Sequence, residues 1–349
     1  MTKDQNILII GGGFAGARAA QDLVKSGFSN VSLIDRKDYF EVTYSTLRTL
    51  ANPGFGERGR MRYSDFIKGG FKQGDVTQLS KNAAKLADGS EVAFDTAIVA
   101  TGSSYSSFPV AKSAEALSLD ARAAEMSSEH DKLAAANTVL IVGGGAVGVE
   151  LAGEIADHFP NKTVTLAEAG DRILSDLKPK ASATAQSQLE SLGVRVLTGS
   201  KLTPDDDAYK EADLVYMCVG LTPNTELMKA EFASSLAPSG RIMVDDQFRV
   251  AGAETIYAMG DCASTPDVKF GYVADAQGAL LAKNIAAASA GKSTKDFKAQ
   301  PVMSLIPVGR RRGVAQMPFG VTTLGFFVNM KQKDMFVSRQ FANLGVKVK

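Results

Sequence analysis

The stretch ILIIGGGFAG, residues 7–16, decides the fold of this chain. Its four leading apolar residues predict a buried parallel strand, and Gly11, Gly13 and Gly16 predict a tight turn into a helix. The first glycine permits the turn, the second lets a pyrophosphate approach the backbone, and the third lets helix and strand pack closely. The phosphates would then contact the free amides and the positive dipole end of that helix.

The sequence after this helix strengthens the assignment, because a glycine-rich turn alone is common. Residues 31–34 predict a second strand, and Asp35 follows it directly. This carboxylate lies about 20 residues beyond the loop, where a dinucleotide-binding domain places an acid on a ribose hydroxyl. The alternative is a domain of the same kind that binds no dinucleotide.

The same pattern occurs a second time. Residues 138–142 predict a strand, GGGAVG at residues 143–148 is a second glycine loop, and Glu168 follows the predicted strand at residues 163–167. Two such fingerprints, each with its acid, are far more specific than one. Residues 201–212 look like a loop, so we expect the second domain to lack a full meander of strands.

We therefore predict an α/β fold with two Rossmann-type dinucleotide-binding domains and a small C-terminal α+β region. The first domain is expected to be discontinuous and to comprise residues 1–108 and 240–300. The second is expected at residues 109–239, and the C-terminal region at residues 301–349.

Composition excludes several classes of protein. The 39 Lys and Arg residues nearly balance the 38 Asp and Glu residues, so net charge predicts neither a nucleic acid nor a membrane as partner. Cys218 and Cys262 form no CxxC, zinc or disulfide pattern, and two histidines predict no metal site. No run of about 18 apolar residues, secretory signal or myristoylation glycine is present, so we expect a cytoplasmic protein.

Residues 36–60 interrupt the alternation of strands and helices. Residues 47–50 look helical, and Pro53 follows as a stop signal. If the first loop binds a flavin nucleotide, Tyr44 and Arg48 would be placed to contact the flavin ring. Ordinary packing of the tyrosine and a solvated arginine are equally compatible with the sequence.

Two further strand ends carry potential chemistry. Residues 94–99 predict a buried strand that ends in ATG, residues 100–102, and residues 256–259 predict one that ends in Gly260-Asp261 ahead of a helix. Asp261 would be placed to bond a ribityl hydroxyl, and the following helix start to stabilise negative charge on a reduced flavin. A surface aspartate that caps a turn is the alternative.

The C-terminal region is basic and partly apolar. Residues 310–312 are arginines, residues 319–330 are largely apolar, and Val337, Phe341 and Leu344 would share one face of a helix. Such a terminus fits a membrane surface, a dimer contact or core packing equally well.

Together these features resemble the flavoprotein reductases that contain two dinucleotide-binding domains. In that family the first loop binds FAD, the second binds NAD(P)H, and the Gly-Asp motif returns to the FAD. A closer resemblance is to the ferroptosis suppressor proteins, also called apoptosis-inducing-factor-like. The segments that carry it are DYFE (38–41), STLR (45–48), GVELAGEI (148–155), YAMGDCA (257–263) and VGRRRGVAQ (308–316). The missing myristoylation glycine and the trimmed second domain depart from the vertebrate members.

The resemblance implies which residues bind the cofactors and act in catalysis. FAD would be bound by Gly11, Gly13, Gly16, Asp35, Thr101 and Asp261, and NADH or NADPH by Gly143, Gly145, Gly148 and Glu168. Glu150 resembles the family's glutamate beside the nicotinamide and the flavin, although a helix N-terminus favours an acid in any case. Tyr44 and Arg48 are the other candidate catalytic residues. Further cofactor contacts are expected at Phe14, Ala15, Arg36, Arg48, Val76, Ala100, Gly102, Ala146, Val147, Glu150, Gly220, Gly260, Tyr272 and Val273.

The activity implied by the resemblance is that of an FAD-dependent NAD(P)H:quinone oxidoreductase. Hydride would pass from NADH to flavin N5, and two electrons would then pass to a ubiquinone-like quinone. Residues 274–278 partly resemble the quinone-site helix of type II NADH dehydrogenases, with Ala276 in place of one of two usual glutamines. Glu168 favours NADH, because a carboxylate repels a 2′-phosphate. A homodimer and a peripheral membrane contact through the C-terminus are further expectations, and a nucleic-acid partner is not expected.

Two other functions remain compatible with the sequence. One is an NADH-dependent reductase of a ferredoxin-type protein, for which residues 310–312 would provide docking charge. The other is a slowly reacting redox sensor similar to apoptosis-inducing factor. A disulfide reductase is excluded because no CxxC or CxxxxC exists, and a peroxidase or coenzyme A disulfide reductase because residues 36–60 contain no cysteine.

Overall fold

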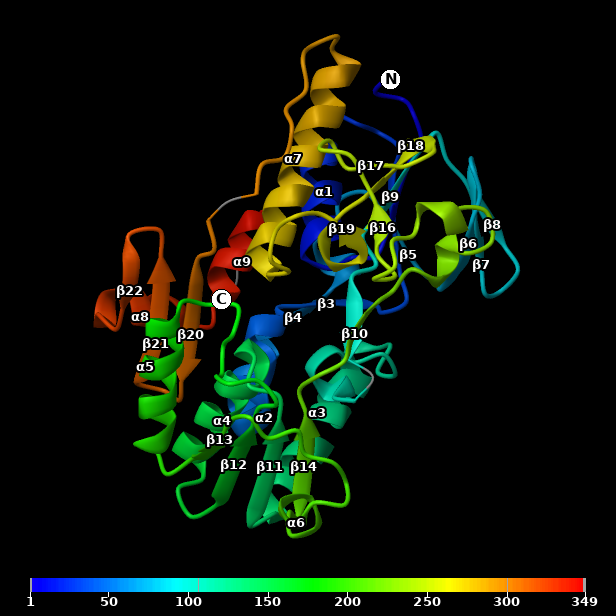
Figure 1. The fold of residues 1–349 in the computed structure, drawn as a ribbon. Coiled ribbons are helices and arrows are strands. Elements are labelled where there is room, and N and C mark those ends of the chain that lie inside the picture. Colours follow the sequence, from blue (N-terminus) through cyan, green and yellow to red (C-terminus); the bar gives the residue numbers. More distant parts are fainter. Residues whose placement is uncertain (1, 106, 300, 348–349) are drawn as a thin grey trace.

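The structure is a computed structural model that describes residues 2–105, 107–299 and 301–347. Residues 1, 106, 300 and 348–349, which belong to the predicted domain ranges, lie outside it. Two α/β units lie one above the other, and the C-terminal region lies along one side of both (Figure 1). No helix within the described ranges is long and apolar enough to cross a bilayer.

The first unit is built on a six-stranded sheet with the order β17-β18-β9-β1-β2-β5. Its strands are β1 (Ile7–Ile10), β2 (Val31–Asp35), β5 (Gly70–Gln73), β9 (Thr96–Val99), β17 (Arg249–Val250) and β18 (Ala253–Ala258). All neighbours pair in parallel except β17 with β18. Ile10 lies opposite both Ile34 and Val99, so the central strands end together at one edge of the sheet.

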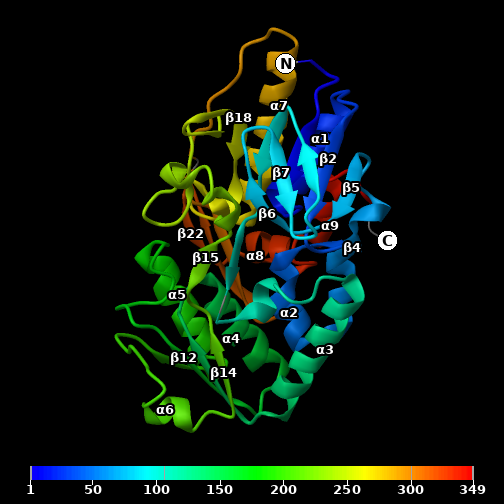
Figure 2. The same ribbon diagram turned by 90° about the vertical axis from the view of Figure 1, so that its right-hand side faces the viewer.

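Each face of this sheet is covered by a different layer. Helices α1 (Phe14–Lys25) and α7 (Gly271–Ser289) pack together on one face, where a Cβ at Gly278 would collide with the carbonyl of Ala15. The other face carries the antiparallel meander β6 (Val76–Leu79), β7 (Ala83–Leu86) and β8 (Glu91–Ala93), which lies in the foreground of Figure 2. Leu79 and Leu86 share a buried cluster with Leu8 and Ile10.

The second unit repeats the core of the first. Its four parallel strands, in the order β13-β12-β11-β14, are β11 (Thr138–Val142), β12 (Thr163–Ala167), β13 (Arg195–Leu197) and β14 (Leu214–Met217). Helix α4 (Ala146–His158) follows β11 as α1 follows β1, and α3 (Leu119–Ala135) and α5 (Pro179–Glu190) complete the unit. Between β13 and β14 the described chain forms no strand, which confirms that the meander is missing, and the predicted loop contains one four-residue helix, α6 (Asp207–Lys210).

A two-stranded antiparallel ribbon joins the two units. It consists of β10 (Ser103–Tyr105) and β15 (Leu221–Pro223) and lies between the sheets in Figure 1. After β15 the chain packs on the first unit, since Leu227, Met228 and Phe232 belong to the same buried cluster as Leu8. The return to the first unit therefore occurs before the predicted boundary at residue 239.

The segment between β2 and β5 reaches from the first unit to the second. Strands β3 (Tyr39–Glu41) and β4 (Arg60–Arg62) form a hairpin, and α2 (Thr46–Ala51) confirms the helix predicted at residues 47–50. Leu47 and Leu50 of α2 lie in the same buried cluster as Val149 of α4. The first unit thereby contributes side chains that contact the helix of the second glycine loop.

The C-terminal region forms a sheet and two helices. The sheet contains β20 (Ser304–Val308), β21 (Arg312–Met317) and β22 (Gly320–Thr322), and the helices are α8 (Gly325–Gln332) and α9 (Val337–Asn343). Val337, Phe341 and Leu344 are buried against the first unit. Of the three alternatives for this apolar stripe, core packing is therefore the one observed. The last two residues of the basic terminus, 348 and 349, lie outside the described residues.

Candidate functional site

A cavity of ≈ 1190 Å³ lies between the two units and the C-terminal region. This volume exceeds the range of about 300–1,000 Å³ that is usual for drug-sized ligands. A site that holds a dinucleotide and a second substrate requires such a larger cavity. Of the residues predicted from the sequence, those that line the cavity are Gly11, Gly13, Phe14, Ala15, Asp35, Arg36, Tyr44, Val76, Ala100, Thr101, Gly102, Ala146, Val147, Glu150, Gly260, Asp261 and Tyr272.

Other predicted residues do not line it. The second glycine loop contributes only through the start of α4, while Gly16, Val273 and Gly220 also lie outside the cavity wall. Gly16 is buried behind the first loop, where a Cβ would collide with the carbonyl oxygen of Gly11. Gly16 therefore serves the close packing of helix on strand, which is the third-glycine role predicted from the sequence.

The two glycine loops have the same geometry. Gly13 and Gly145 are the residues that precede α1 and α4, with φ near −64° and −70°, and a Cβ built on either one meets nothing within 4 Å. Gly16 and Gly148 each lie against the carbonyl oxygen of the loop's first glycine. A bound pyrophosphate requires open space at the helix N-terminus and close packing of the helix on the strand behind it. Both loops meet these requirements and therefore fit a dinucleotide.

Asp35 and Glu168 form equivalent contacts to their own glycine loops. Asp35 Oδ2 accepts a hydrogen bond from Gly12 N at 2.6 Å, and Glu168 Oε2 accepts one from Gly144 N at 2.6 Å. The sequence predicted ribose contacts for these acids and did not predict this loop contact. A carboxylate has about four lone-pair sites, so a ribose hydroxyl can still be accepted beside the loop amide.

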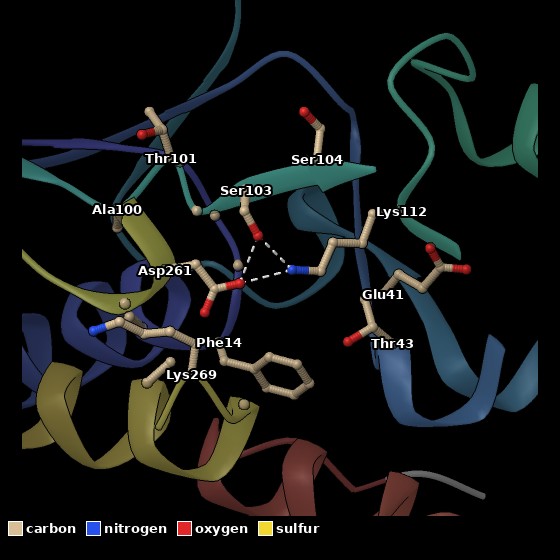
Figure 3. Close-up of a pocket in the computed structure, with 18 of the residues that line it drawn as sticks. Phe14, Glu41, Thr43, Ala100, Thr101, Ser103, Ser104, Lys112, Asp261 and Lys269 are labelled. Carbon is tan, nitrogen blue, oxygen red and sulfur yellow. Dashed lines mark hydrogen bonds and ion pairs between the residues drawn. The ribbon is translucent and has the colours of Figure 1, made fainter. Parts of the chain in front are cut away.

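Asp261 lies in the cavity at the centre of a charged cluster that the sequence analysis missed (Figure 3). Its Oδ2 accepts hydrogen bonds from Ser103 Oγ and Lys112 Nζ, each at 2.7 Å. Burial alone would raise the pKa of this carboxyl, but the nearby ammonium of Lys112 and both hydrogen bonds hold it below its ordinary value. Asp261 is thus an ionised acceptor. No motif surrounds Lys112, so only the folded chain reveals it.

Glu150 lines the cavity from α4, where it meets a cation from the C-terminal region. Lys331 Nζ of α8 donates to Glu150 Oε1 at 2.6 Å, and both side chains are more than nine-tenths buried. Burial raises the pKa of Glu150, and the ammonium of Lys331 opposes this shift. Lys331 also lies 5.6 Å from the ring centroid of Tyr44. No sequence pattern points to Lys331, because it is remote in the chain from both loops.

Aromatic rings form the wall next to this pair. Tyr44 stacks on Phe14 with a centroid distance of 4.9 Å and contacts Phe336 edge to face at 6.3 Å. Burial raises the pKa of the Tyr44 hydroxyl well above its ordinary value, and this hydroxyl has no hydrogen-bond partner among the described residues. Tyr44 therefore lines the cavity beside the first loop, and its contact with a flavin ring stays a prediction.

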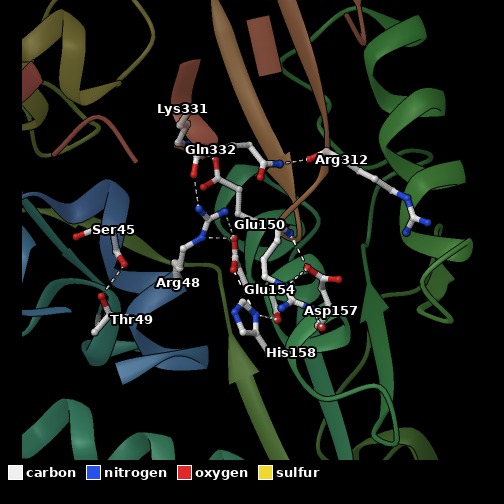
Figure 4. Close-up of polar contacts among 11 residues, drawn as sticks. Ser45, Arg48, Thr49, Glu150, Glu154, Asp157, His158, Arg312, Lys331 and Gln332 are labelled. Atoms are coloured by element: carbon white, nitrogen blue, oxygen red, sulfur yellow. Dashed lines mark hydrogen bonds and ion pairs between the residues drawn. The ribbon is translucent and has the colours of Figure 1, made fainter. Parts of the chain in front are cut away.

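Arg48 corrects one sequence-based expectation. It was predicted to contact the flavin ring, yet it does not line the cavity, and its guanidinium is buried in an ion pair with Glu154 of α4 at 2.7 Å. The guanidinium points away from α2 toward the buried carboxylate of Glu154 in the second unit (Figure 4). Gln277 likewise lies outside the cavity, and its Oε1 accepts from Gly260 N at 2.7 Å.

The cysteines take no part in the site. Cys218 and Cys262 are both buried free thiols and do not line the cavity. Burial raises the pKa of Cys218 to about 12, which keeps the thiol protonated and unreactive. The predicted exclusion of dithiol chemistry is consistent with this arrangement.

The site and fold define a class. The chain belongs to the pyridine nucleotide-disulphide oxidoreductase family, whose model matches residues 5–280. It is accordingly an oxidoreductase that uses FAD and NAD(P)H, as the sequence predicted.

Within this class, the similarity to one group extends over nearly the whole chain. Ferroptosis suppressor protein 1 of Xenopus tropicalis is 32% identical over 362 residues, which cover 97% of this chain and 96% of the relative. Apoptosis-inducing factor homolog B of Dictyostelium discoideum is 28% identical, with 98% and 97% covered. The sulfide:quinone oxidoreductase of Aquifex aeolicus has the same fold, with a TM-score of 0.78, 13% identity and coverage of 98% and 92%. The predicted resemblance is confirmed.

Proposed function

We propose that this chain is an FAD-dependent NADH:quinone oxidoreductase in which the first loop binds FAD and the second binds NADH. When bound, FAD supplies the redox chemistry, accepting a hydride from NADH and passing two electrons to the quinone. The observation that carries the proposal is the convergence of three parts of the chain on one cavity. The first loop, Glu150 of α4 and Lys331 of α8 all line it.

The protein's own groups orient the reactants and hold charge. Asp261 and Asp35 offer carboxylate oxygens to the hydroxyls of a nucleotide in the first unit. Glu150 and Lys331 form a desolvated pair, and charges that are fixed in a water-poor cavity act more strongly on a reaction than charges in solvent. Full reduction of a quinone takes up two protons as well as two electrons. Lys331, held by Glu150, is the group that can keep a proton at this wall.

The side of the cavity formed by α7, β20 and α8 fits an apolar acceptor. Tyr272, Met303 and Met330 line it and are 37%, 36% and 42% exposed. Apolar side chains at an opening favour a quinone ring with a lipid tail over a charged substrate. We place the quinone entrance here.

The first test is anaerobic stopped-flow absorbance of the purified holoprotein, mixed with NADH and then with a soluble short-chain quinone. Bleaching of the flavin band followed by rapid recovery with quinone is the expected result. Bleaching without recovery would replace the quinone with a protein acceptor or with the redox-sensing function. A preparation that never contains flavin would contradict the proposal at its base.

We expect the chain to use NADH with a lower KM than NADPH. Glu168 is the acid at the second loop, and a carboxylate there repels a 2′-phosphate while it bonds a 2′-hydroxyl. Glu168→Gln keeps an oxygen for the amide of Gly144 but removes the charge. The ratio of the KM for NADPH to the KM for NADH should therefore fall roughly tenfold, which corresponds to the loss of one charged hydrogen bond of about 1.5 kcal/mol. Steady-state KM values for both nucleotides, with Asp171→Asn as the control, provide the test. Equal KM values in the unmodified protein would contradict the assignment.

We further propose that an exposed apolar surface next to this entrance contacts a membrane. Phe319, Leu324 and Phe326 are 72%, 64% and 75% exposed, and Met330 belongs both to this surface and to the cavity wall. A lipid quinone could pass from the bilayer to the cavity without crossing water.

Phe319→Ser combined with Phe326→Ser should weaken vesicle binding more than tenfold, because each buried phenylalanine contributes about 1.5–3 kcal/mol. Co-sedimentation with phosphatidylcholine vesicles, with and without phosphatidylserine, measures this. Met243→Ser, which changes a 36% exposed residue of the first unit, is the control. If vesicle binding is absent and sedimentation velocity gives a dimer that the double variant dissociates, the surface is instead the homodimer contact expected from the sequence.

A further inference from the structure

One face of α4 carries three acids, each paired with a cation from another part of the chain (Figure 4). Glu150, Glu154 and Asp157 lie at positions i, i+4 and i+7, which share a helix face. Their partners are Lys331 of α8 at 2.6 Å, Arg48 of α2 at 2.7 Å and Arg310 of the β20–β21 turn at 2.8 Å. Of these acids only Glu150 lines the cavity.

The middle pair is the most deeply buried. The side chains of Arg48 and Glu154 are 7% and 1% exposed, and Arg48 Nε and Nη2 both donate to Glu154 Oε1, at 3.0 and 2.7 Å. Glu154 Oε2 accepts no hydrogen bond within the described part of the chain, and His158 Nδ1 lies 3.6 Å from it. Fully desolvated ion pairs cost free energy to bury, so this pair needs a reason beyond stability.

The third guanidinium nitrogen of Arg48, Nη1, binds the end of α8, and this contact gives the buried pair a role beyond stability. Arg48 Nη1 donates to the carbonyl oxygen of Gln332 at 2.7 Å. Gln332 is the last residue of α8, and the last carbonyls of a helix have no partner within the helix. A cation at this end also interacts favourably with the helix dipole. The Gln332 side-chain amide in turn donates to the carbonyl of Arg312 on β21. The end of α8 is thus held from two sides.

This anchor lies one residue from Lys331. α8 is only eight residues long, and Leu324 just before it and Phe326 in its first turn are exposed, so its position depends mainly on its C-terminal half, where Val328, Lys331 and Gln332 are buried. We propose that Arg48 is a positioning residue: by binding Glu154 and the Gln332 carbonyl together, it fixes the last turn of α8 so that Lys331 reaches Glu150. Arg48 does not touch the cavity itself and acts through Lys331. This inference rests on the proposed function of the Glu150–Lys331 pair.

The test uses the double variant Arg48→Met with Glu154→Gln in the full-length holoprotein. Removing both charges avoids an unpaired buried carboxylate, so the variant should fold and retain FAD. Hydrogen–deuterium exchange of peptides that cover residues 325–335 measures the anchor directly. We expect at least tenfold faster exchange there and little change in β1, β11 or α1. Arg310→Met, which breaks the exposed outer pair on the same helix face, is the matched control and should leave exchange in α8 unchanged.

A second measurement is the pH dependence of flavin reduction by NADH. The pKa of Glu150 depends on Lys331, which it faces, and on the charges of Glu154 and Arg48. The double variant removes the charges of Glu154 and Arg48 together. A displaced Lys331 no longer lowers the pKa of Glu150, so the acid limb of the rate profile should move to higher pH. Lys331→Met should move it in the same direction.

Exchange in α8 and a pH profile that both match the unmodified protein would overturn the positioning role. So would equal changes in the Arg310→Met control. Failure of the proposed function would give a different result. The unmodified protein would then not pass electrons to quinone, but hydrogen–deuterium exchange in α8 would still increase in the double variant.

Discussion

Glu150→Gln is expected to slow the reduction of bound flavin by NADH roughly a hundredfold, the loss typical of removing one preorganised electrostatic group from an active site. Glutamine has nearly the shape of glutamate but no charge, so the buried ammonium of Lys331 loses its counter-charge at 2.6 Å. An uncompensated buried charge also destabilises the fold by up to about 3–5 kcal/mol. Single-turnover stopped flow measures the rate, and thermal unfolding measures the stability.

Asp157→Asn is the control for this prediction. Asp157 lies on the same face of α4 and pairs with a cation, but its partner Arg310 is 58% exposed and neither residue lines the cavity. Flavin reduction by this variant should match that of the unmodified protein. If Glu150→Gln reacts as fast as the control, the acid has no role in the reaction and only pairs with Lys331. The alternative drawn from the sequence, an acid favoured by the helix N-terminus, does not account for Glu150, because this residue is the fifth of α4 and lies beyond the first turn.

The pH dependence separates the two explanations further. Burial raises the pKa of Glu150 above its ordinary value, so the ionised form is lost at a higher pH than for an exposed glutamate. If ionised Glu150 holds Lys331 in place, the rate should fall as pH decreases through this raised pKa. Glu150→Gln should lack that limb altogether, which a constant structural defect would not produce.

Local chain chemistry made the two nucleotide loops predictable from the sequence. Gly13 and Gly145, Gly16 and Gly148, and the acids Asp35 and Glu168 all have roles that a short strand–turn–helix unit determines by itself. The repeat places them in equivalent positions, and the structure shows equivalent contacts. Asp261 was found for the same reason, because it directly follows a buried strand.

Residues that depend on contacts between distant segments were missed or misplaced. Lys331 and Lys112 meet their carboxylates from 181 and 149 residues away, and no local pattern encodes such a meeting. Arg48 was assigned to the flavin because α2 follows the first βαβ unit. Its guanidinium is instead directed by Glu154, 106 residues further along the chain, and the helical spacing of Glu150 and Glu154 was the one available signal.

Gly13→Ala should strongly weaken the binding of FAD, and Gly145→Ala should strongly weaken the binding of NADH, with each variant affecting one nucleotide only. Both glycines have φ values that alanine adopts easily, and the added Cβ meets no protein atom within 4 Å. The apoprotein should therefore fold normally, while a pyrophosphate is held away from the helix N-terminus. The loss of two charged hydrogen bonds, at about 1.5 kcal/mol each, weakens binding roughly a hundredfold.

Gly13→Ala should thus purify with little flavin, and its Kd for added FAD should rise, whereas Gly145→Ala should retain FAD and show a raised KM for NADH only. Fluorescence titration of the apoprotein with FAD and steady-state kinetics with NADH measure the two effects. The comparison is informative because the loops are sterically equivalent, so a difference between the variants reflects the nucleotide bound at each loop and not the strain introduced. Loss of FAD from Gly145→Ala with retention in Gly13→Ala would reverse the assignment of the loops. Glu150 would then follow the FAD loop, and its role beside the nicotinamide would fall with that assignment.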